Sequence, residues 1–102
     1  MQPGVPLWKL VPTRDEEGVP LCDFMVLIPR LKLRDALYIG KAQSHIAGVL
    51  ERHREVVFAN MDLNLNLLWV SHRHRSGTML EIIHAIRLAV PEAVLVAHTT
   101  RN

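Results

Sequence analysis

The first clear pattern along the chain is a continuous apolar run, "CDFMVLIP", at residues 22–29. The run does not alternate with polar residues, and it ends at a proline, which has no amide proton to donate to a sheet. An uninterrupted apolar run of this length is typical of a strand that is covered on both faces. The pattern therefore predicts a buried central strand at 22–29.

Residues 34–54 show the three- and four-residue spacing of an amphipathic helix, with Asp35 in the position of an N-cap. The spaced apolar residues are Ile39, Ala42, Ile46, Val49 and Leu50. Gly40 and Gly48 weaken this helix. Together with Ser44 they form a stripe of small residues, which predicts close packing against a neighbour.

A second helix is predicted from Thr78 to Pro91, because Thr78 and Glu81 have the spacing of a capping box and proline ends the pattern. Its apolar stripe consists of Met79, Ile82, Ile83, Ile86, Ala89 and Val90. Three further segments are predicted strands, at 55–63, 67–74 and 93–100, and the first two are joined by a short hairpin at 64–66.

The predicted order over residues 22–100 is βαββαβ. The compact arrangement of that order is an α+β, ferredoxin-like sandwich, in which two helices cover one face of a four-stranded antiparallel sheet. Right-handed crossovers give the strand order 4-1-3-2. Residues 1–21 carry four of the six prolines and are expected to form an N-terminal arm or an edge hairpin outside the domain at 22–102.

The predicted strands are apolar on both faces, whereas an antiparallel sheet with one solvated face alternates apolar and polar residues. The face away from the helices would be formed by Met25, Leu27, Leu67 and Trp69. A bare apolar face of that size is rare in monomers. We therefore expect a homodimer built through this face, with the N-terminal arm and its Trp8 as the alternative cover.

Composition narrows the function classes. The 102 residues suffice for one domain, and 12 Lys+Arg against 10 Asp+Glu are too balanced to predict nucleic-acid binding. One cysteine allows no internal disulfide, and no segment resembles a membrane span or a signal peptide, so the expected location is the cytoplasm. The carboxylates show no close pair suited to acid–base catalysis, and the expectation is a protein without catalytic machinery.

In the predicted topology, the starts of the first two strands share one edge of the sheet with the ends of the last two. We call this edge the rim. It collects four of the six histidines and five of the twelve cations. The histidines are His53, His72, His74 and His98, and the cations are Arg52, Arg54, Arg73, Arg75 and Arg101.

The first chemistry that suits the rim is metal binding. Residues i and i+2 of a strand share a face, so His72 and His74 are expected to project together. His98, with Cys22 or Asp23, would complete a set of N, S or O donors for a divalent transition metal such as zinc. The arginines argue against a metal, because guanidiniums beside the ion add like charge.

The second chemistry is anion binding at the start of the second helix, whose first amides lack internal partners. The candidate residues are Arg73, Arg75, Ser76, Gly77, Thr78 and Arg101. The G-x-x-x-x-G-K-[ST] pattern of a Walker loop is absent. The sequence thus predicts a small ligand-binding or regulatory domain that takes a metal or a small anion at the rim. The alternative is a structural or protein-interaction module that uses the apolar sheet face and has no small ligand.

Overall fold

The computed structural model describes residues 17–18 and 20–100. Most of the predicted N-terminal arm, and Arg101, lie outside the described residues. The elements are β1 (Cys22–Leu27), the short 3-10 helix η1 (Leu31–Leu33), α2 (Ala36–Glu51), β2 (Val56–Asp62), β3 (Leu67–His72), α3 (Thr78–Arg87) and β4 (Val94–Thr100). All four predicted strands and both predicted helices are present. The first strand ends at Leu27, two residues before the predicted end, and the 3-10 helix follows after it.

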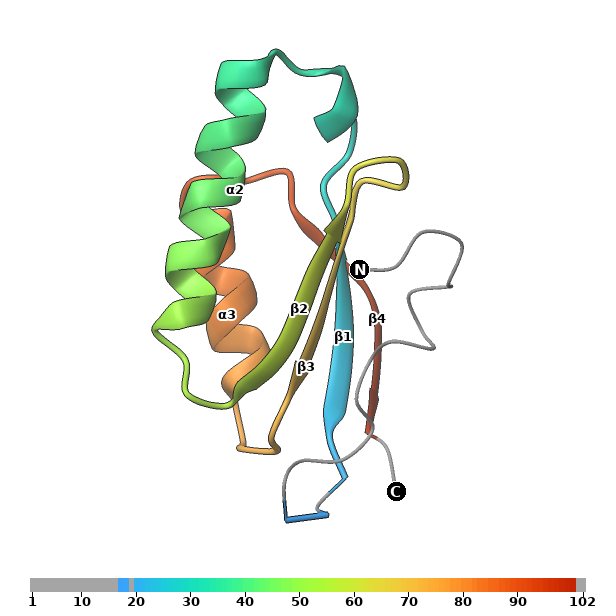
Figure 1. Ribbon diagram of the computed structural model, residues 1–102, viewed down its shortest axis with the longest axis vertical. Helices are drawn as coiled ribbons and strands as arrows, with labels where there is room; N and C mark the ends of the chain where they lie inside the picture. The colour runs from blue at the N-terminus through green and yellow to red at the C-terminus, as the bar shows by residue number, and fades with distance from the viewer. Residues whose placement is uncertain (1–16, 19, 101–102) are drawn as a thin grey trace.

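The four strands form one antiparallel sheet in the order β2-β3-β1-β4, which is the predicted order 4-1-3-2 read in reverse. Both helices lie on the same side of the sheet (Figure 1). The predicted ferredoxin-like βαββαβ sandwich is therefore confirmed. No helix in the described part of the chain is both long and apolar enough to cross a membrane.

The core fills the space between the sheet and the helices. Phe24 and Val26 of β1 and Val70 of β3 are at most 1% exposed, and they meet the buried faces of α2 and α3. Burial of one such side chain stabilises a fold by about 1.5–3 kcal/mol. The core therefore determines which face of β1 is turned towards the helices. The side chain of Cys22, two residues before Phe24, lies on that same face.

Local signals set several boundaries as predicted. Asp35 caps α2, since its Oδ1 accepts a hydrogen bond of 2.8 Å from the amide of Tyr38. In the hairpin after β2, Asp62 Oδ1 accepts hydrogen bonds from the amides of Asn64 and Leu65, at 2.9 and 3.2 Å. These side-chain acceptors satisfy amides that the regular elements leave free.

Two local predictions were wrong. Thr78 does not cap α3, because the N-cap is Gly77, with φ 86°, and no side chain bonds to the free amides there. Glu81 instead pairs with an arginine of the preceding loop. The small-residue stripe of α2 is not packed closely, since a Cβ added at Gly40 or Gly48 would meet no atom within 4 Å.

Candidate functional site

The topology brings the predicted rim together at one end of the sandwich, the lower end in Figure 1. Cys22 at the start of β1 lies opposite His72 at the end of β3, and His72 in turn lies opposite Val56 at the start of β2. The loop at 73–77 then leads directly into α3. The first turn of that helix therefore faces the end of the sheet.

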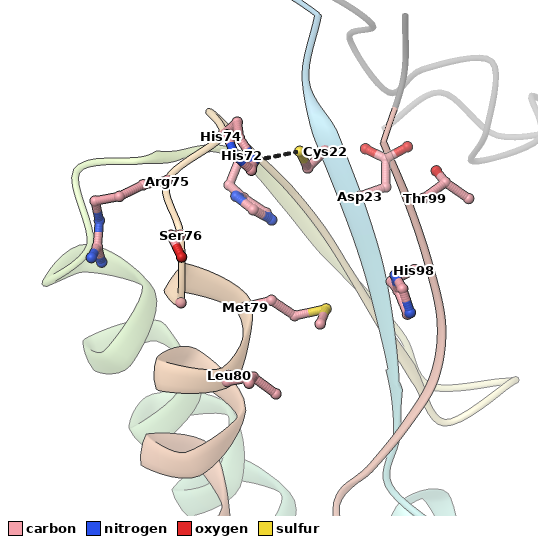
Figure 2. Close-up of a pocket in the computed structure, with 11 residues that line it drawn as sticks. Cys22, Asp23, His72, His74, Arg75, Ser76, Met79, Leu80, His98 and Thr99 are labelled. Atoms are coloured by element: carbon pink, nitrogen blue, oxygen red, sulfur yellow. Dashed lines mark hydrogen bonds between the residues drawn. The ribbon is translucent and has the colours of Figure 1, made fainter.

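A cavity of about 260 Å³ lies between the first turn of α3 and the ends of β1, β3 and β4. We call it the rim pocket. Its lining residues are Cys22, Asp23, His72, His74, Arg75, Ser76, Gly77, Met79, Leu80, His98 and Thr99. This set includes every residue that was predicted from the sequence as a metal ligand. Figure 2 shows how these residues are arranged.

Two potential metal donors of the pocket, a cysteine and a histidine, are in contact. The Sγ of Cys22 lies 3.7 Å from Nδ1 of His74 (Figure 2), and Cys22 is 6% exposed. In a tetrahedral zinc site, bond lengths of about 2.3 Å to sulfur and 2.0–2.1 Å to nitrogen separate the two donors by about 3.5 Å. The spacing of this pair therefore matches two ligands of one ion.

His72 is buried next to this pair, and its ring packs against Phe24 with centroids 5.6 Å apart. Its Nδ1 lies 2.9 Å from the carbonyl oxygen of Arg73. Because a carbonyl only accepts, this Nδ1 carries the proton. In the neutral ring Nε2 then holds the lone pair. Metal-binding histidines usually have their second nitrogen fixed by such a contact.

His98 enters the same pocket from β4, on the far side of β1 in Figure 2. It lies opposite Phe24, two residues along β1 from Cys22, which corresponds to about 7 Å of strand. A register shift at Met25/Val26 puts His98 on the helix side of the sheet. Without that bulge it would lie opposite Asp23, on the other face.

The predicted four-ligand set is thus only partly assembled. Cys22 and His74 are in contact, and His72 is next to them, but His98 lines the opposite wall of the pocket. Across the described residues, no group of three or more His, Cys, Asp or Glu side chains has the spacing of a metal site. Asp23 lines the pocket but hydrogen-bonds through Oδ1 to the hydroxyl of Ser71, at 2.7 Å.

The loop that carries His74 is held by ion pairs of Arg75. Its guanidinium lies 2.6 Å from Oε2 of Glu55, at the entry to β2, and 2.6 Å from Oε2 of Glu81 in α3. These bonds raise the pKa of Arg75 above its ordinary value. The pKa of Glu81 is lowered chiefly by Arg75, and that of Glu55 by its own backbone amide and then by Arg75.

This cluster changes the charge balance at the start of α3. Within this cluster, the carboxylates of Glu55 and Glu81 and the guanidinium of Arg75 sum to −1. The sequence had suggested a surplus of arginine charge at this place. The spacing of Arg75 and Glu81 gave no hint of it, because the two residues meet only through the turn at Gly77. Glu55 lies at the entry to β2, and its pairing with Arg75 depends on the path of the loop at 73–77.

The remaining predicted anion ligands are scattered. Ser76 and Gly77 line the pocket, whereas Thr78 is fully buried and its hydroxyl has no hydrogen-bond partner within the described part of the chain. Arg73 is exposed and directs Nη1 towards the carbonyl of Arg54, at 3.5 Å. Arg101 lies outside the described residues. Of the described members of this set, Arg75, Ser76 and Gly77 line the rim pocket, and Arg73 and Thr78 are not among its lining residues.

Comparison of the chain with models of protein families gave no match, and no curated protein or solved structure showed significant similarity to it. The function is therefore argued from the geometry of the rim pocket.

Proposed function

We propose that this domain binds a transition-metal ion, with zinc as the reference case, in the rim pocket. Cys22 and His74 supply the first two donors, and His72 supplies the third through Nε2. The observation that carries the proposal is the separation of 3.7 Å between Cys22 Sγ and His74 Nδ1. Thiolate and imidazole are the donors that zinc and copper prefer in proteins.

The charge of the pocket favours a cation over an anion. Glu55 and Glu81 both pair with Arg75, the arginine that lines the pocket, so the charge of this guanidinium is offset by two carboxylates. This weakens the objection that positive charge beside the ion opposes a metal, as far as Arg75 is concerned. It also removes the strongest candidate for holding a phosphate or carboxylate.

The proposed site is open rather than closed. Structural zinc sites hold four protein ligands, whereas sites with fewer protein ligands leave positions for water or an exchanging ligand. His72 would have to shift its ring to join the pair, because no three donors have the spacing of a metal site among the described residues. Three donors from the chain would then leave a further position on the ion open to the pocket. The function that we propose for this shell is reversible binding, as in a metal sensor or carrier.

We propose further that two chains assemble through the sheet face opposite the helices. Met25, Leu27, Leu67 and Trp69 are each only half-buried in the single chain, and Val94, which lies opposite Leu27, is 48% exposed. A second copy placed about a two-fold axis would cover these apolar side chains. The alternative function, an interaction module without a small ligand, uses this same face.

The test of the metal proposal is a calorimetric titration of zinc into chelator-treated, tag-free protein at neutral pH. We expect saturable binding of one ion per chain, weakened at least about tenfold in Cys22→Ser and in His74→Ala, since loss of even an outer-shell partner costs about 10–100-fold. His84→Ala, an exposed histidine of α3 outside the pocket, is the matched control. Binding that both pocket variants retain would contradict the proposal.

A further inference from the structure

β4 is an edge strand of the sheet. Among the described residues it pairs with β1 alone, so one side of its backbone has no partner strand there. Edge strands are commonly protected by lysine or proline. The sequence of β4, "VLVAHTT", contains neither, and Val96 is 48% exposed. The strand therefore has the properties of a template for a further strand.

A groove lies on one flank of α3, and all its lining residues belong to α3 or to the segment directly after it. It encloses about 380 Å³ and is lined by Leu80, Ile83, His84, Arg87, Leu88 and Pro91. Leu80 and Leu88 are 64% and 73% exposed, so the groove presents apolar surface to solvent.

Two contacts fix the direction in which the groove faces. His45 of α2 bonds through Nε2 to the carbonyl of Ala85, at 2.9 Å, so Ala85 marks the α2 side of α3. Leu80 is on the other flank, where it lines the rim pocket together with His98 and Thr99 of β4. The groove therefore runs on the β4 side of α3, away from α2.

An extended peptide added to β4, on the side where no described strand pairs with it, would lie under this flank. Alternate side chains of a strand point to opposite faces, so every second side chain of the added strand would point towards the helix layer and the groove. Leu80 and Leu88 would then be covered. Addition of a strand beside a helix is an established mode of peptide recognition, in which the backbone provides affinity and the groove provides selectivity.

The charge of the groove selects the partner. His84 and Arg87 are its charged or titratable residues, and no carboxylate lines it. Arg87 Nε lies 3.4 Å from the carbonyl of Pro91, which fixes the guanidinium at the end of the groove. A second copy of the chain would bring the same cationic flank to the contact. We infer that β4 and α3 form a docking groove for an extended, acidic-apolar strand of a partner protein.

The probe for this inference is an end-blocked, fluorescein-labelled peptide of six residues that alternates valine and glutamate. We expect saturable binding to the full chain by fluorescence anisotropy, at least about tenfold tighter than that of the matching valine–lysine peptide. Amide NMR shifts should concentrate in β4. Leu88→Glu and Arg87→Glu should each weaken binding at least about tenfold, whereas Leu37→Glu, a control leucine 68% exposed in the first turn of α2, should not.

Several outcomes would overturn the inference. These are equal binding of the lysine peptide, equal loss in Leu37→Glu, amide shifts centred on β2 or on the open sheet face, and no binding at all. Strong protection of the β4 edge amides in the free protein would overturn it as well. Protection that depends on protein concentration would mean that a second copy of the chain covers the β4 edge. Protection that does not depend on concentration would mean that the N-terminal segment of the same chain covers it.

Discussion

At the scale of single residues, Gly77 controls how the chain enters the rim pocket. It has φ +86°, in the left-handed region, and it separates the loop that carries His74 from the first turn of α3. The left-handed conformation costs any residue with a Cβ about 1–2 kcal/mol. Gly77→Ala is therefore expected to lower the free energy of unfolding by about that amount, measured by urea denaturation; an unchanged midpoint would contradict this.

Gly48 provides the opposite case within the same chain. It lies in the middle of α2 with ordinary helical backbone, and an added Cβ would meet no atom within 4 Å. Alanine is preferred to glycine in a helix by about 0.8–1.0 kcal/mol. We expect Gly48→Ala to raise the urea midpoint and to leave metal binding unchanged. A lower midpoint would mean that the stripe of small residues is packed after all.

At the scale of elements, the loop between β3 and α3 is held by Arg75 through Glu55 of the β2 entry and Glu81 of α3. Both carboxylates have a pKa below their ordinary value of 4.5 in the folded state. Their contribution to stability is therefore complete above pH 4.5 and is lost as the pH falls through the lowered pKa.

The corresponding prediction compares the wild type with Arg75→Gln in urea at pH 7, 5 and 3. Without the guanidinium the two carboxylates titrate closer to their ordinary pKa, so the variant should start with a lower midpoint and lose less between pH 5 and pH 3. Other carboxylates, such as Glu92, titrate in both proteins and cancel in the difference. Parallel pH profiles would contradict the assigned role of Arg75.

The elements themselves could be predicted, because apolar periodicity decides which residues form strands and helices, and handedness decides their order. Two properties of the pocket could not. The side of the sheet that His98 faces depends on a bulge opposite Met25/Val26. No residue of "VLVAHTT" predicts this bulge. The ion pairs of Arg75 depend on the path of the five-residue loop 73–77. That path brings its guanidinium to both Glu55 and Glu81.

At the scale of the whole molecule, the proposed dimer places its contact on the sheet face and leaves the helix layer free. Light scattering after size-exclusion chromatography should give twice the mass of one chain. Trp69→Glu should give a single-chain mass with an unchanged circular dichroism spectrum, whereas Leu65→Glu, a leucine of the hairpin turn that is 60% exposed, should stay dimeric. A wild-type protein with the mass of one chain would contradict the dimer.

The central claim is that Cys22 and His74 bind one ion together, and cobalt absorption tests it most directly. Cobalt(II) follows zinc into tetrahedral sites, and a bound thiolate adds a charge-transfer band in the near ultraviolet. We expect this band to grow to saturation at one cobalt per chain in the wild type, to be absent from Cys22→Ser, and to disappear on addition of zinc. Saturation without the band, or the same spectrum in both proteins, would contradict the proposed site.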